Sequence, residues 1–436
     1  MLAAIPLLAV CVVDAAAVLG RHSGESLHRS APAPAASGAP QHALVSDAIR
    51  NAAIREVLPR RGDAVMTHDA AEWRSTLDPD NPQFLQAQMK VFSNLQQVPF
   101  ASWTYSMDPS RSMQSPRARL YDGPTWAPAQ LFLNYRLRGF DPRATSLPQY
   151  PTFVRRGSAW FLASLNDFKR RGDVSSTDLW DYGPVSVVRT HSVLVLGHPS
   201  ARGVMRNLAD EVAADIPRVT AVWGHNWPQR AVVLVPSTQH ELGQVVQDYG
   251  QLNHIAAVAT AEVQIGSGRP DPVGDRIGVN PANWSKLSAL GQRIVLTHEL
   301  THVATRAVTS AALPTWLAEG FADYVGYLGS GVPTTFVAQE LGAAVRSGDV
   351  PRNLPTTSQF NGASKQLSQA YEGAWLACRM IAQRWGQQAL VRFYASVGRS
   401  DLAPAAAVQL AMRRLLHLNE ASFVQQWRGF LRTELD

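Results

Sequence analysis

The chain is 436 residues long, 46% of them hydrophobic and 17% charged, with a formal net charge of +6. This composition excludes an intrinsically disordered protein, and the length favours two or three domains over a single core. The basic residues are dispersed in short pairs such as Arg60-Arg61, without a long basic run, so we interpret the charge as a solvated surface and expect no nucleic-acid partner. Two cysteines, Cys11 and Cys378, are too few for a disulfide framework.

Residues 1–20 are predicted to be a signal peptide or a membrane anchor. The run from Leu2 to Gly20 is apolar except for Asp14, which is long enough to span a bilayer and also fits a signal-peptide core. Either interpretation makes the rest of the chain extracytoplasmic, and a buried helix of a cytosolic protein is the alternative. Residues 21–43, rich in Pro, Ala and Ser, predict a linker. Abundant Arg and Ala with little Lys indicate a GC-rich bacterial genome, so we expect a protein of the bacterial cell envelope, secreted or membrane-anchored.

Residues 44–187 predict a first folded domain, with helices before strands. Amphipathic patterns predict helices at 44–58 and 81–98. Strand-like patterns predict strands at 101–107, 117–123, 129–139, 151–165 and 186–197. Helices followed by one curved antiparallel sheet resemble an NTF2-like or cystatin-like domain. Its aromatic residues line a pocket or, as is commoner at strand spacing, form a core: Trp103, Phe132, Tyr135, Trp160 and Phe161. No acid–base group stands out, so we interpret this domain as a binding or spacer module.

Residues 188–436 predict a second domain, making the whole chain α+β. Short strands alternate with helices up to residue 284 and favour an α/β layer, and the sequence after residue 327 is predominantly helical. We expect 275–281 to be an edge strand of the layer. The Gly-rich segment 266–275 lacks a G-K-[ST] element and is interpreted as a mobile loop, not a phosphate-binding loop.

The motif HELTH lies in a predicted helix from Leu287 to Val308. His298 and His302 are four residues apart, so they lie one turn apart on one helix face and can each direct a nitrogen to one Zn²⁺. Glu299 follows the first histidine, where its carboxylate can act on a zinc-bound water without being a ligand. A surface stripe of charged residues is the alternative for this motif alone.

A second predicted helix, starting at Pro314, carries Glu319 and Asp323. Their spacing of four places both carboxylates on one face. Glu319 is the natural third zinc ligand, which would leave a fourth position open as in catalytic sites. Asp323 would support a zinc-bound histidine by accepting its other ring N–H.

The motif HELTH, with Glu319 seventeen residues after His302 in the pattern W-x-x-E-G-x-x-D, resembles the gluzincin metallopeptidases and, more narrowly, the bacterial peptidase-MA-like domains. The resemblance implies a zinc-dependent peptidase fold, with the motif helix under a short mixed sheet whose edge strand binds an extended peptide. It also implies that a downstream Tyr or His stabilises the oxyanion. Tyr371 is the candidate for that role, and packing in the core is its alternative. No third histidine follows His302 closely, which excludes the metzincin pattern.

The sequence therefore predicts a zinc metallopeptidase that hydrolyses peptides or proteins with Glu299 as general base. The absence of a G-x-M-E-N element favours an endopeptidase. Three alternative interpretations compete with this one. Arg293 and Arg306 flank the motif and disfavour an intramembrane protease, and the presence of Glu299 disfavours a non-catalytic zinc module. A membrane-tethered binding protein with a vestigial peptidase fold remains the alternative from another functional class.

Overall fold

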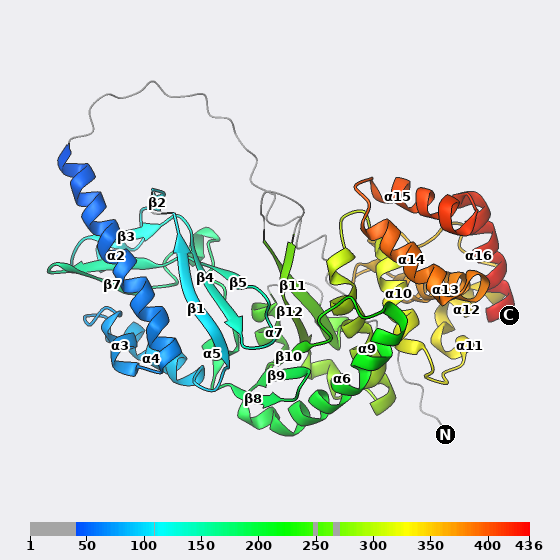
Figure 1. Ribbon diagram of the computed structural model, residues 1–436, viewed down its shortest axis with the longest axis horizontal. Coiled ribbons are helices and arrows are strands. Elements are labelled where there is room, and N and C mark those ends of the chain that lie inside the picture. The colour runs from blue at the N-terminus through cyan, green and yellow to red at the C-terminus, as the bar shows by residue number, and fades with distance from the viewer. Residues whose placement is uncertain (1–40, 109, 247–251, 265–270) are drawn as a thin grey trace. The chain divides into compact units, whose positions relative to one another are not determined.

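The computed structural model describes residues 41–108, 110–246, 252–264 and 271–436. These residues form two compact units, which divide between Val187 and Val188 (Figure 1). The predicted leader at 1–20 and nearly all of the predicted linker lie outside the described residues, so both stay predictions. Among the described helices, none combines the length and the apolar character that crossing a membrane requires.

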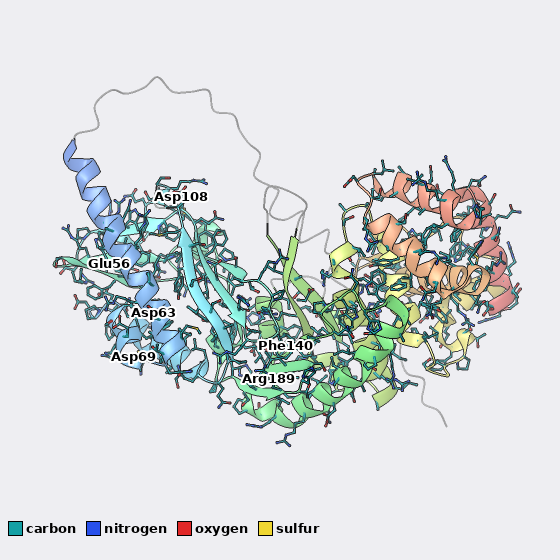
Figure 2. All side chains as sticks on the ribbon, viewed as in Figure 1. Glu56, Asp63, Asp69, Asp108, Phe140 and Arg189 are labelled. Atoms are coloured by element: carbon teal, nitrogen blue, oxygen red, sulfur yellow. The ribbon has the colours of Figure 1, made fainter. Side chains whose placement is uncertain are left out.

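The first unit begins with three helices, two of which confirm predicted ones, and a fourth helix follows its last strand. The bounds are α2 (Gln41–Thr67), α3 (Ala70–Ser75), α4 (Pro82–Asn94) and α5 (Leu179–Tyr182). Helix α2 starts inside the predicted linker. It buries Ile54, Val57 and Leu58 at helical spacing, whereas Glu56 and Asp63, labelled in Figure 2, are exposed.

The strands of the first unit form two antiparallel sheets, where a single curved sheet was expected. One sheet has the order β1-β4-β5 and the other β2-β3-β6-β7. The chain passes between the two sheets three times, and the last passage is at Pro151, which cannot donate a ladder hydrogen bond. The predicted strand at 117–123 is wrong, since a 3₁₀ turn (η1, Ala118–Leu120) occupies it. The bounds are β1 Phe100–Met107, β2 Ser112–Met113, β3 Thr125–Pro128, β4 Leu131–Leu137, β5 Thr145–Gln149, β6 Thr152–Arg156 and β7 Ala159–Ser164.

Aromatic side chains form much of the core of the first unit. Trp103, Tyr135 and Trp160 are each at least nine-tenths buried, and Phe100 contacts Trp103, Tyr135 and Trp180 edge-to-face at centroid distances of 4.9, 5.8 and 5.5 Å. Their burial confirms the core interpretation for Trp103, Tyr135 and Trp160. The NTF2-like resemblance of this unit stays a prediction.

The second unit contains a five-stranded sheet with the order β11-β12-β10-β9-β8. Strands β9, β10 and β12 are parallel, and β11 pairs antiparallel with β12. The prediction that 275–281 is an edge strand is wrong, because β12 lies between β11 and β10, and β11 is the edge. Residues 271–275, expected in a loop, belong to β12. The bounds are β8 Ser186–Arg189, β9 Val193–Gly197, β10 Ala231–Val235, β11 Ala257–Gln264 and β12 Asp271–Val279.

Helices make up the rest of the second unit, as the sequence predicts (Figure 1). The motif helix α9 ends in a 3₁₀ turn (η5, Arg306–Val308) and packs on α6, on α10 and on strand β11. The helices are α6 Arg202–Trp223, α7 Gln239–Val245, α8 Pro281–Trp284, α9 Ala289–Thr305, α10 Thr315–Tyr327, α11 Thr334–Val337, α12 Gln339–Arg346, α13 Leu367–Trp385, α14 Gln387–Gly398, α15 Pro404–Ala411 and α16 Glu420–Leu435.

Helix α10 lies between α9 and α13, and two glycines allow the close approach. A Cβ on Gly320 would lie 2.3 Å from the carbonyl oxygen of Ala374 on α13, and one on Gly326 would lie 3.0 Å from the carbonyl oxygen of Ile294 on α9. The helix backbones touch at both points, which sets the distance between α9 and the side chains that α10 directs at it.

Candidate metal centre

Helix α9 is held in place at the start of the HELTH motif. Ser288 caps it by accepting a hydrogen bond from the N–H of Gly291. Next to His298, the hydroxyl of Thr297 donates to Oδ2 of Asp215 at 3.0 Å, which ties α9 to α6. Asp215 is fully buried. This anchor limits rotation of the helix and therefore fixes the direction in which both motif histidines point.

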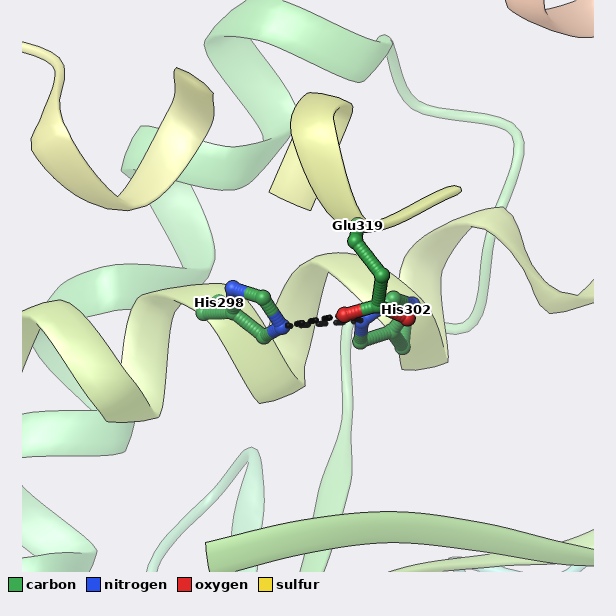
Figure 3. A group of neighbouring side chains, drawn as sticks. All are labelled: His298, His302 and Glu319. Atoms are coloured by element: carbon green, nitrogen blue, oxygen red, sulfur yellow. Dashed lines mark hydrogen bonds and ion pairs between the residues drawn. The ribbon is translucent and has the colours of Figure 1, made fainter. Parts of the chain in front are cut away.

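His298, His302 and Glu319 converge on one point, as predicted (Figure 3). The Nε2 atoms of the two histidines are 3.0 Å apart, and Oε2 of Glu319 lies 3.4 Å from the first and 3.8 Å from the second. Ligands about 2.0–2.1 Å from a tetrahedral Zn²⁺ would be separated by about 3.4 Å, so these spacings fit one ion. Oε2 of Glu319 is buried and accepts no hydrogen bond from the described residues, as expected of an atom that binds a cation.

Asp323 contacts the first histidine of the motif. Its Oδ1 lies 2.8 Å from Nδ1 of His298, and both side chains are buried. A carboxylate at this distance keeps the proton on Nδ1, which leaves the lone pair of Nε2 directed at the other ligands. Glu319 and Asp323 come from successive turns of α10, so this one helix supplies both a ligand and the support of another ligand.

The electrostatics of the ligand set favour a cation. Burial raises the pKa of Glu319, but the neighbouring His302 and His298 outweigh it and hold the pKa at about 2, so the carboxylate is charged. Burial keeps the pKa of His302 below its ordinary value, so this imidazole is neutral. For His298 burial also lowers the pKa, but Asp323 and Glu319 raise it well above the ordinary value. A metal ion must therefore compete with a proton on that ring.

Glu299 lies beside the ligands with its two oxygens in different situations. Oε2 accepts a hydrogen bond of 2.7 Å from the N–H of Ala259 on the edge strand β11. Oε1 is buried and has no hydrogen-bond partner among the described residues. Burial, with the charge of Glu319, raises the pKa of Glu299 to about 8. One oxygen is therefore anchored, while the other is available to accept a proton.

Tyr371 is on α13 and is 96% buried, with a relative exposure of 4%. Its ring contacts Phe360 edge-to-face at a centroid distance of 5.0 Å. Its proposed interaction with the oxyanion stays a prediction.

Sequence reasoning missed two neighbours of Glu299, namely Ala259 and Arg306. Arg306 is four residues after His302 and seven after Glu299, so helical periodicity placed it on their face. Nothing in the sequence indicated Ala259, because its contact with Glu299 is made by the main-chain N–H and does not depend on the side chain.

No protein-family model and no curated protein matches the chain. Its matches are to solved structures. The chain is similar to a two-domain M1 zinc metallopeptidase mutant bound to L-arginine, with 13% identity, a TM-score of 0.32, and coverage of 65% of this chain and 60% of that one. It is similar to an M1 zinc metallopeptidase from Deinococcus radiodurans, with 14% identity, a TM-score of 0.31, and coverage of 65% and 58%. The same enzyme as a Glu-to-Ala mutant bound to a Tyr-Ser-Ala substrate gives 14% identity, a TM-score of 0.31, and coverage of 65% and 59%.

The chain thus spans about 60% of the length of the structures that it matches. At these TM-scores the likeness carries no argument about its activity, and the functional argument rests on the side chains.

Proposed function

We propose that this protein is a zinc-dependent peptidase in which His298, His302 and Glu319 hold the metal and Glu299 is the general base. The observation that carries the proposal is the convergence of two imidazole nitrogens and one unpartnered buried carboxylate oxygen, at spacings that fit one ion. Two His and one Glu leave a fourth coordination position open, which is typical of catalytic zinc and not of structural zinc. Bound zinc would supply Lewis-acid activation of water and of a carbonyl group.

Glu299 moves the proton in this scheme. With Oε2 held by the N–H of Ala259, its unpartnered Oε1 accepts the proton of the attacking water and then delivers it to the amine that leaves. Burial of the ligand set excludes bulk water from the base. A non-catalytic zinc module would have no use for a fully buried carboxyl group kept beside the ligands, since such a group costs stability when charged.

The substrate that we propose is a peptide or protein, cleaved internally. The supports are the ligand set and the absence of a G-x-M-E-N element in the sequence. We also propose that the enzyme acts outside the cytoplasm, in the bacterial envelope, on the strength of the apolar segment in residues 1–20.

The test is cleavage of a peptide library by the zinc-loaded protein, read by mass spectrometry. Glu299→Gln should lower turnover by about 10²–10⁴-fold, because it removes the base, while one zinc per chain is retained. Glu319→Ala should lose zinc and activity together.

Glu56→Gln, an exposed position on α2, is the matched control and should keep full activity. Full turnover by Glu299→Gln would remove Glu299 as the base. A folded, zinc-loaded protein that cleaves nothing in the library would contradict the peptidase and favour the tethered binding protein.

A further inference from the structure

The guanidinium of Arg306 lies on the same helical face as Glu299 and His302, where α9 passes into the 3₁₀ turn η5. It is 92% buried, with a relative exposure of 8%. Its Nε donates to Oδ1 of Asp275 on β12 at 2.7 Å, and its Nη2 donates to the carbonyl oxygen of Ala259 on β11 at 3.3 Å. A single side chain therefore connects the end of the motif helix to both strands of the β11–β12 hairpin.

Ala259 is the residue on which two contacts from the α9–η5 segment meet. Its N–H donates to Glu299, and its C=O accepts from Arg306. It pairs with Ile277 in the antiparallel ladder. In such a ladder the N–H and C=O of one residue point to the same side, so both main-chain groups of Ala259 face away from β12 and toward α9. The edge strand is thus fastened to the motif helix at one peptide residue.

We propose that Arg306 is a positioning residue for Glu299, a role that rests on the proposed function. Arg306 donates to the carbonyl of Ala259 and is paired with Asp275. It thereby holds the edge strand β11 in the position where the N–H of Ala259 donates to Oε2 of Glu299. Oε1 then stays directed at the ligand set. If the strand moved away, Glu299 would lose its hydrogen bond from Ala259, and its carboxylate would rotate away from the ligand set.

The chemistry of arginine suits this position. Its planar, forked guanidinium can serve a carboxylate in one direction and a carbonyl in another, and it stays charged when buried. A lysine could keep the ion pair with Asp275 as a point charge, but it lacks the second arm that reaches Ala259. Arg306→Lys therefore removes the hydrogen bond to the edge strand while it keeps the positive charge that neutralises Asp275.

The first experiment measures hydrogen exchange at the amide of Ala259 by NMR, in the metal-free and in the zinc-loaded protein. Arg306→Lys should raise the exchange rate by about tenfold or more, because the strand can open locally. Asp275→Asn, which keeps the arm to Ala259, should raise it less. Arg293→Lys, an arginine of α9 on the side of Asp215, is the matched control and should leave it unchanged.

The second experiment measures steady-state cleavage and zinc content of the same variants. Arg306→Lys should lower kcat by about 10–100-fold, with KM within about twofold and zinc retained, because a misplaced base slows the chemical step. A lower melting temperature with kcat and Ala259 exchange unchanged would show that Arg306 only stabilises the fold, and would overturn the proposal. If Arg306→Lys does not fold, Asp275→Asn takes its place, and unchanged Ala259 exchange together with unchanged kcat in that variant would overturn the proposal.

The two proposals fail in different ways. An inactive wild-type protein would contradict the proposed function, whereas the exchange of Ala259, which needs no substrate, would still show whether Arg306 holds the strand.

Discussion

The pair His298–Asp323 shows how one contact sets the chemistry of a ligand. Asp323 accepts from Nδ1 at 2.8 Å, and burial raises the pKa of Asp323 against the effect of the histidine. The histidine opposes the effect of burial on the Asp323 carboxyl group, and that carboxyl group in turn keeps the proton of His298 on Nδ1.

We expect Asp323→Ala to weaken zinc binding by about 10–100-fold, because His298 would lose the group that orients its ring. Competition for zinc with a chromophoric chelator measures this affinity. Asp349→Ala, at an exposed carboxylate far along the chain, should bind zinc as the wild type does. Unchanged affinity in the Asp323 variant would show that packing alone orients the ring.

Local spacing was enough to predict most of the candidate site. The separations between His298, Glu299 and His302, and between Glu319 and Asp323, are helical periods, and each predicts a shared face without knowledge of the fold. Ala259 could not be predicted, because its contact with Glu299 spans 40 residues and uses the main chain. The Arg306–Asp275 contact spans 31 residues and depends on where β12 lies in the sheet.

Helix α10 shows how packing between elements places a ligand. Gly320 follows Glu319 and faces α13, so the distance between those two backbones also positions the carboxylate over α9.

Gly320→Ala should destabilise the second unit by about 1–3 kcal/mol and weaken zinc binding, because the added Cβ meets a backbone carbonyl that cannot move aside. Gly429→Ala is the matched control. Gly429 lies inside α16 and a Cβ there would meet nothing within 4 Å, so the change should stabilise by up to about 1 kcal/mol through helix propensity. Chemical denaturation measures both. A stabilising Gly320→Ala would contradict the close approach of α10 and α13.

The strands illustrate a limit of sequence patterns. Alternation predicted that 101–107 and 129–139 are strands, and each is confirmed by a strand within or next to those bounds. Alternation reports which side chains share a face, but it does not report which strand lies next to which. For this reason the single sheet expected in the first unit is two sheets, and the predicted edge strand β12 lies inside its sheet.

The molecule as a whole consists of two compact units, and the candidate metal centre belongs to residues 188–436 alone. Metal removal should therefore affect the units differently. At free zinc about 1,000 times its Kd, binding stabilises the folded unit by about 4 kcal/mol, so chelation should lower the melting temperature of that unit by about 10 °C.

Differential scanning calorimetry of the full chain, with and without a chelator, makes this comparison. The transition of residues 41–187 should stay in place and serves as the internal control. A chelator that shifts neither transition, or shifts both equally, would contradict a metal site confined to the second unit.

The amino-acid pattern alone was sufficient to predict that His298, His302 and Glu319 converge, that Asp323 lies on the same helix face as Glu319, and that the second unit is largely helical, because these depend on spacing within single helices. The anchoring of Glu299 by Ala259, the contacts of Arg306, the edge position of β11 and the division of the first unit into two sheets follow from packing between segments distant in the chain. The physical reason is that helical periodicity arises from hydrogen bonds between near neighbours. The pairing of strands and the contacts of a main-chain carbonyl are instead selected by the free energy of the whole folded core.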